Sequence, residues 1–180
     1  MKNEKGVKQI LRLTVTLLLI CALVAAVLAG VNTITKDKIA AAQEQKTLDA
    51  LAAVLPGVEN LKPITLVGDT GGVNRVYRSG NNFAVEVASA GFDGPVTLMV
   101  GISDGKVVGI RVVSHTETPG LGAVAAAKNA KGEAFRNQFV GAVGDLAVGE
   151  NIDAISGATI TSRSVVNSVN AALEYVKTLG

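Results

Sequence analysis

The chain is poor in the residues that build disulfides, metal clusters and aromatic cores. Its 180 residues include one cysteine (Cys21), one histidine (His115) and no tryptophan, and aromatic residues make up 3% of the total. A single cysteine excludes an intramolecular disulfide, and one cysteine with one histidine excludes a Cys/His metal cluster. No run of Asp and Glu has the spacing of a calcium loop, so we predict no metal site. The core must be aliphatic.

The chain also has little net charge outside its first residues. The formal net charge is +2, and residues 1–31 contribute +3 through Lys2, Lys5, Lys8 and Arg12 against Glu4. The remainder then holds 13 basic and 14 acidic residues, a net charge of −1. A near-neutral domain with few aromatic residues is a poor candidate for binding nucleic acid.

One stretch without any charge, residues 13–31 (LTVTLLLICALVAAVLAGV), is long enough to cross a bilayer as a helix. Basic residues precede it, so the positive-inside bias predicts that residues 1–12 are cytoplasmic and that the rest of the chain is extracytoplasmic. Three alternatives are a cleaved signal peptide, a lipoprotein signal at Cys21 and a buried core helix. The uncharged run is long for a signal peptide and for a buried core helix, and Ile20 stands where a lipoprotein signal needs a small residue. We therefore favour an uncleaved, single-pass anchor.

The rest of the chain has the pattern of an α+β domain with an antiparallel sheet and flanking helices. Residues 32–57 are predicted to be a helical connector, with helix over 33–55 and a stop at Pro56-Gly57. Residues 58–180 form the predicted domain. Alternating apolar residues predict strands around 83–87 and 96–102, and Asp104-Gly105 predicts a hairpin turn into a strand over 107–113. Two shorter strands are predicted near 64–67 and 73–78.

Helices are predicted in the second half of the domain. Residues 122–140 are rich in alanine and are predicted to be mostly helical, with Phe135 and Phe139 four positions apart. A glycine-rich loop follows, and the last helix is predicted over residues 162–179. The buried stripe of that helix is predicted from spacing to consist of Val165, Val169, Leu173 and Val176.

A cluster of small and hydroxyl residues, DAISGATIT (residues 153–161), stands just before the last helix. Thr161 or Ser162 occupies the expected N-cap position, and capping is the common use of such hydroxyls. Capping does not account for Asp153 or for the Ser-Gly-Ala-Thr run. A turn of small residues that leads into a helix exposes backbone N–H groups at the positive end of the helix dipole, which favours a bound phosphate beside Thr159.

Residues 153–159 resemble the flavinylation motif Asp-x-x-(Ser/Thr)-Gly-Ala-Thr of the FMN-binding domain family. In that family a flavin transferase uses FAD to attach FMN through its phosphate to the last threonine. The resemblance implies that Thr159 is the covalent acceptor and Asp153 the acidic element, while Ser156, Gly157 and Ala158 complete the cofactor site. The link is a phosphodiester, which leaves the isoalloxazine ring free to carry one or two electrons. We place Thr161 as the helix cap.

A second stretch, HTETPGLG (residues 115–122), resembles the same family and implies a loop that lines the flavin. Thr118 is then expected to hydrogen-bond the flavin or its phosphate, and Leu121 to pack on the ring. Glu117 either belongs to this lining or caps and orients the loop. His115 is expected to be a satisfied structural residue. The G-x-G-x-x-A pattern at residues 120–125 does not follow a parallel strand directly, so we reject a dinucleotide site.

The arrangement of anchor, connector, GFDGP turn (residues 91–95) and both motifs is similar to that of the G subunits of Rnf electron-transport complexes. This resemblance implies an electron-carrier subunit of an ion-translocating ferredoxin:NAD oxidoreductase in the bacterial cytoplasmic membrane. Its partners would be the membrane and iron–sulfur subunits of that complex, and no catalytic residue of its own is expected. Two alternatives stay open, namely a subunit of the related Na⁺-translocating NADH:quinone reductase or another membrane flavin carrier, and a non-redox membrane-anchored scaffold.

Overall fold

The computed structural model describes residues 2–68 and 70–179, with side chains from residue 7 onward. The chain divides into two compact units, Met1–Gln45 and Lys46–Gly180. The first helix, α1 (Lys2–Val54), makes up the first unit and supplies the beginning of the second. Within the first unit its apolar side chains are exposed, Leu17 by 63% and Leu23 by 68%. A helix of this length and apolarity can cross a membrane, and it fits a single-pass anchor. The predicted boundaries of the span, residues 13–31, stay a prediction.

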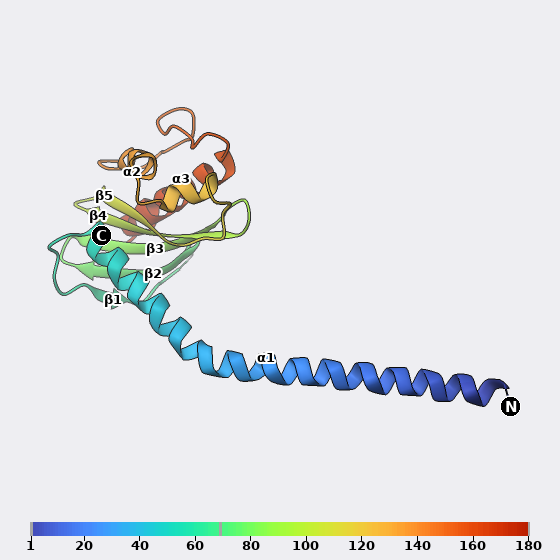
Figure 1. The fold of residues 1–180 in the computed structure, drawn as a ribbon. Coiled ribbons are helices and arrows are strands. Elements are labelled where there is room, and N and C mark those ends of the chain that lie inside the picture. Colours follow the sequence, from blue (N-terminus) through green and yellow to red (C-terminus); the bar gives the residue numbers. More distant parts are fainter. Residues whose placement is uncertain (1, 69, 180) are drawn as a thin grey trace. The chain divides into compact units, whose positions relative to one another are not determined.

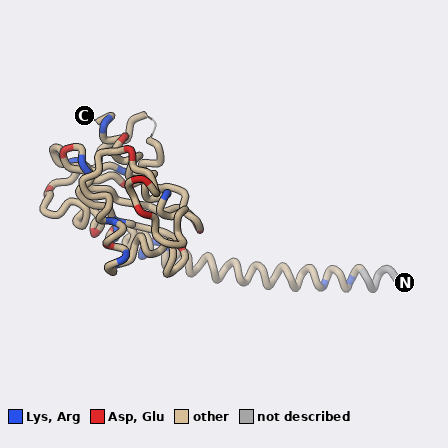
Figure 2. The backbone as a smooth tube through the Cα atoms, turned by 90° about the horizontal axis from the view of Figure 1, so that it is seen from above, with Lys and Arg blue, Asp and Glu red and all other residues tan. Residues whose placement is uncertain are grey.

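Charged residues follow the same division. Figure 2 shows Lys, Arg, Asp and Glu interspersed over the second unit, whereas the middle of α1 carries none of them. That uncharged part of the helix contains the predicted span.

A five-stranded antiparallel sheet forms the centre of the second unit, and its strands lie side by side in chain order (Figure 1). The strands are β1 (Lys62–Ile64), β2 (Val73–Ser79), β3 (Asn82–Ala90), β4 (Pro95–Ser103) and β5 (Lys106–Ser114). The Asp104-Gly105 hairpin is confirmed, with φ of 49° and 76°, the left-handed backbone that a two-residue hairpin turn requires. The first strand was predicted near residues 64–67 and lies earlier, at Lys62–Ile64, where it pairs with β2.

Both faces of the sheet are covered, which explains the apolar character of the central strands. The side chains of Phe83, Val85 and Val87 belong to the larger core, which they share with helix α3 (Thr159–Lys177). The predicted stripe of α3 is confirmed, because Val165 and Val169 are fully buried and Leu173 and Val176 nearly so. The predicted α+β fold is thus the observed one.

The other face of the sheet is covered by the end of α1. Leu51, Val54 and Leu55 are buried there against Ala84 and Met99. A paired glycine on each of β4 and β5 makes room for the helix, since a Cβ on Gly101 would overlap the Val54 carbonyl oxygen. The end of the predicted connector is therefore part of the domain.

The segment predicted to be one long helix over residues 122–140 consists of two short elements instead. These are the 3₁₀ helix η1 (Gly122–Ala126) and the α-helix α2 (Ala130–Asn137). Between them the Asn129 side chain accepts a hydrogen bond from Gly132 N at 3.0 Å and caps α2. Arg136 holds the two elements together by donating to the carbonyl oxygens of Ala125 at 2.8 Å and Ala127 at 2.9 Å.

Candidate functional site

The site is built around the first turn of α3. Gly157 has φ +74°, a backbone conformation that favours glycine, and it turns the chain into the helix. The helix begins at Thr159, and Ala158 occupies the N-cap position with no hydrogen bond from a side chain. The Thr159 side chain is exposed. An uncapped helix start with an exposed hydroxyl on its first residue presents N–H groups and a positive dipole end to solvent.

The prediction that Thr161 or Ser162 caps this helix is wrong, because both lie inside its first turn. The Ser162 hydroxyl donates to Ala158 O and accepts from Ile155 N, each at 2.9 Å, so it fastens the preceding loop to the helix. The Thr161 side chain points inward and is 1% exposed. The small residues at 157–158 let the chain turn three residues earlier than the hydroxyl pattern suggested.

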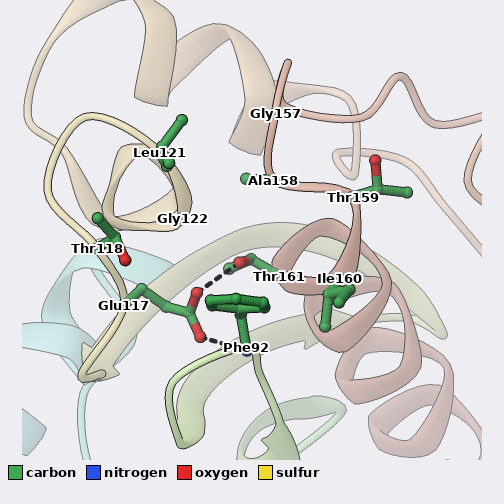
Figure 3. Close-up of a pocket in the computed structure, with 10 residues that line it drawn as sticks. All are labelled: Phe92, Glu117, Thr118, Leu121, Gly122, Gly157, Ala158, Thr159, Ile160 and Thr161. Carbon is green, nitrogen blue, oxygen red and sulfur yellow. Dashed lines mark hydrogen bonds between the residues drawn. The ribbon is translucent and has the colours of Figure 1, made fainter.

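The buried Thr161 hydroxyl donates to a carboxylate from the HTETPGLG loop. Its Oγ1 lies 2.6 Å from Glu117 Oε2, and Glu117 itself is 5% exposed. The other carboxylate oxygen, Oε1, accepts from Phe92 N at 2.7 Å and from Asp93 N at 3.4 Å, both in the turn between β3 and β4. Figure 3 shows Glu117 between Thr161 and Phe92. Of the two roles left open for Glu117, this geometry favours orienting the loop.

Burial raises the pKa of the Glu117 carboxyl, whereas its three hydrogen bonds, that from Thr161 foremost, and the nearby His115 lower it. The net effect is a pKa below the ordinary value of 4.5. Glu117 is therefore ionised at neutral pH. We expected the ring nitrogens of His115 to have hydrogen-bond partners. Its buried Nδ1 has none within the described part of the chain, so this expectation is not fully met.

A pocket of about 350 Å³ lies between these segments. Three large apolar side chains that line this pocket are unusually exposed: Phe92 by 69%, Ile160 by 51% and Leu121 by 44%. Leu121 lies over Gly157, where a Cβ would stand 3.1 Å from its Cδ2. Figure 3 shows these side chains together with Thr118 around the pocket, while Thr159 lies at the start of the helix. The pocket thus combines apolar walls with a helix N-terminus.

The structure gathers most of the predicted site residues at this pocket. Its lining includes Glu117, Thr118, Leu121, Gly157, Ala158 and Thr159. Asp153 and Ser156 do not line it but face a neighbouring hollow of about 570 Å³. There the Gln138 side chain holds the backbone of Asp153, accepting from its N–H at 2.8 Å, and the Asp153 side chain is exposed. Residues 153–159 therefore border two hollows, with Asp153 and Ser156 at one and Gly157 to Thr159 at the other.

Three residues of the lining were not predicted to belong to the site: Phe92, Ile160 and Thr161, the last of which was expected to be the helix cap. The signal for Phe92 was available, because an aromatic residue in a turn between Gly91 and Gly94 has no core position to fill. Ile160 gave no comparable signal, since an isoleucine in a helix is ordinarily a core residue. Its 51% exposure follows from its place on the helix face opposite the sheet.

The residues present fit the flavin mononucleotide that the motifs imply. An aromatic ring system needs an apolar, open pocket, which Phe92, Leu121 and Ile160 provide. A phosphate needs N–H groups and a hydroxyl, which the start of α3 provides at Thr159. Among the described residues, no group of three or more His, Cys, Asp or Glu is placed to hold a metal.

Comparison with known proteins agrees with this fit. Residues 91–174 match the FMN-binding domain family, and residues 1–54 match the RnfG N-terminal region. The G subunit of the ion-translocating oxidoreductase complex of Methanosarcina acetivorans is 35% identical, over 94% of this chain and 95% of the relative. The G subunit of the proton-translocating ferredoxin:NAD(+) oxidoreductase complex of Clostridium ljungdahlii is 32% identical, over 99% and 97%. A third relative, the G subunit of the ion-translocating oxidoreductase complex of Stutzerimonas stutzeri, is 33% identical over 87% of this chain and 76% of its own.

Proposed function

Because this chain belongs to the family of G subunits of Rnf-type ion-translocating oxidoreductase complexes, we propose that it relays electrons within such a complex through FMN attached covalently to Thr159. The observation that carries the attachment site is the contrast between two threonines in one helical turn. Thr159 is exposed at the uncapped start of α3, whereas Thr161 is 1% exposed and its hydroxyl is engaged by Glu117. The exposed hydroxyl is the one that a modifying enzyme can reach.

Attachment needs a donor of the flavin and an enzyme to transfer it, and we propose that a flavin transferase using FAD matures this subunit. The Thr159 oxygen gains a bond to phosphorus and loses its proton, and AMP leaves as the pyrophosphate bond of FAD breaks. Gly157 and Ala158, which directly precede Thr159, add no bulky side chain of their own to the approach to that oxygen. We propose that Asp153 takes part in this approach, which its exposed position on the neighbouring hollow supports.

When bound, FMN acts as the electron carrier, which accepts and releases electrons one or two at a time. The chain's own part is to hold and surround it. Phe92, Leu121 and Ile160 offer apolar contact to the ring, and Thr118 offers a hydroxyl at the edge of the same pocket. A relay of this kind needs no general acid, base or nucleophile from the subunit itself, and we assign none.

The N-terminal helix is proposed to anchor the subunit in the cytoplasmic membrane with residues 1–12 inside and the FMN-binding domain outside. The excess of basic residues before the apolar run supports this orientation. The remaining membrane and iron–sulfur subunits of the complex are the proposed electron donors and acceptors.

The intact mass of the chain from its native membranes tests the proposal. We expect an increase by one FMN less one water. Trypsin is expected to cut after Arg136 and Arg163, so that residues 137–163 form one peptide holding both threonines, and fragmentation between Thr159 and Thr161 then locates the adduct. An unmodified chain, from cells that flavinylate another protein, would refute covalent attachment. An adduct on Thr161 would refute the assigned site.

A further inference from the structure

Three segments that are far apart in the sequence meet at one carboxylate. Glu117 belongs to the loop after β5, Phe92 and Asp93 to the turn between β3 and β4, and Thr161 to the first turn of α3. Phe92 stands 25 residues before Glu117, and Thr161 stands 44 residues after it. These same three segments form the walls of the pocket.

The carboxylate is enclosed as well as bonded. A Cβ on Gly122 would overlap Glu117 Oε2 and approach the Thr161 hydroxyl to 2.5 Å, and a Cβ on Gly91 would overlap Glu117 Oε1. Two glycines therefore leave space for the two oxygens, and no larger residue fits at either position without displacing the carboxylate. A second link, from Thr116 Oγ1 to Asp93 O at 2.9 Å, joins the loop to the turn beside it. The arrangement is specific for a carboxylate-sized acceptor at position 117.

We propose that Glu117 is a positioning residue that holds the Phe92 turn, the 115–122 loop and the start of α3 in one arrangement around the flavin pocket, and that its buried negative charge lowers the reduction potential of the flavin held there. The first part concerns the chain alone. The second part rests on the proposed function, because it needs a flavin in the pocket. A fixed negative charge at the pocket wall disfavours the addition of electrons to a nearby group, since little water screens it there.

A carboxylate that only stabilised the fold would behave differently. Its loss would lower the unfolding temperature and leave the reduction potential of the flavin unchanged. Replacing it with a neutral residue of the same shape would also leave that potential unchanged, since such a residue can still form hydrogen bonds. Glutamine at position 117 keeps an oxygen for the two N–H groups and offers an N–H to the Thr161 oxygen, so it separates the bonding from the charge.

The experiment compares the full-length chain with Glu117→Gln, Glu117→Ala and Thr161→Val, purified in detergent from cells that flavinylate the wild type. Glu150→Gln is the matched control, because Glu150 is exposed and does not line the pocket. Three quantities are measured for each: hydrogen exchange at the amides of Phe92 and Asp93, the visible spectrum of the attached flavin, and its midpoint potential.

We expect Glu117→Ala to raise the exchange rate at the Phe92 amide by about 10- to 100-fold, the effect of losing a hydrogen bond to a charged acceptor. Thr161→Val frees one oxygen and should shift the flavin spectrum, with Phe92 still protected. Glu117→Gln should keep the protection and the spectrum close to wild type but move the midpoint potential to a more positive value. Glu150→Gln should change none of the three.

Unchanged exchange at Phe92 in Glu117→Ala would overturn the positioning role, and a wild-type potential in Glu117→Gln would overturn the charge effect. If Glu117→Ala does not fold, Glu117→Gln and Thr161→Val carry the test, and a wild-type spectrum and potential in both refutes the proposal. Should the wild type carry no flavin, the proposed function fails while the exchange measurement still decides the positioning role.

Discussion

Two substitutions in the same turn of α3 are expected to separate stability from flavin attachment. Thr161→Val should lower the stability of the domain and keep the flavin, whereas Thr159→Val should lose the flavin and leave the stability nearly unchanged. Valine has nearly the shape of threonine and the same branching at Cβ, so neither change opens a cavity or alters the rotamer cost of the helix by much. Each substitution removes one hydroxyl. The two variants therefore isolate what each hydroxyl does.

The expected loss of stability at position 161 follows from its surroundings. The Thr161 hydroxyl is 1% exposed and donates at 2.6 Å to an ionised carboxylate that is 5% exposed. Hydrogen bonds to charged groups contribute about 1.5–3 kcal/mol, and the low exposure of Glu117 limits how well solvent can replace the lost donor. At about 2–4 °C per kcal/mol, that corresponds to a fall in Tm of about 3–12 °C. Thr159→Val removes an exposed hydroxyl and is expected to change the free energy of unfolding by less than about 0.5 kcal/mol.

Calorimetry on the full-length chain in detergent measures the unfolding transition of the domain. The chain for this measurement comes from cells without a flavin transferase, so that flavin does not contribute to the difference. The same two variants made in flavinylating cells are then weighed by mass spectrometry. We expect Thr161→Val to keep the flavin and Thr159→Val to lose it. A wild-type Tm for Thr161→Val would refute the energetic role of its hydrogen bond, and flavin retained by Thr159→Val would refute the acceptor assignment.

Three further predictions concern the rest of the domain. Because the pKa of Glu117 is lowered on folding, its contribution to stability is complete above the ordinary pKa of 4.5 and is lost as the pH falls through the folded pKa. Calorimetry across this pH range should therefore show a smaller fall in Tm with acidification for Glu117→Gln than for the wild type. Gly101→Ala forces a Cβ into the Val54 carbonyl and should cost about 1–3 kcal/mol, whereas Gly109→Ala, with 3.4 Å to the same oxygen, should cost less. Arg136→Met removes one buried and one partly buried hydrogen bond and should lower Tm by several degrees, at about 2–4 °C per kcal/mol; an unchanged Tm in calorimetry would exclude the role of Arg136 in holding η1 and α2 together.

The parts of the fold that were predicted correctly are those governed by strict periodicity. Strands β3 and β4 alternate because each face of the sheet meets a different partner, α3 on one and the end of α1 on the other. The Asp104-Gly105 turn was predictable because few residue pairs adopt its backbone angles. The start of β1 was misplaced since it has only three residues, too few to establish a pattern.

Other features depended on contacts that no local pattern records. The alanine-rich segment 122–140 has high helix propensity throughout, yet it breaks after Ala126, where the Arg136 side chain takes up the carbonyl oxygens that a continuous helix would have used. The partner of Glu117 lies 44 residues away in α3, so the loop motif alone left two roles open. Long-range pairs of this kind become visible only when the segments are brought together.

The opposite orientations of Thr159 and Thr161 could nevertheless have been inferred from the predicted buried stripe of the last helix, which the structure confirms. Successive residues of an α-helix are rotated by about 100°, so positions two apart point to nearly opposite faces, while positions four apart share a face. The confirmed stripe at Val165 and Val169 extends back by four to Thr161, which must then face the core, and it places Thr159 outward. Only the starting residue of the helix was missing. A helix that began at Ser162 would leave both threonines in a loop, where their orientation could not be predicted. With the observed start at Thr159, the Thr161 hydroxyl faces Glu117 and the Thr159 hydroxyl faces solvent.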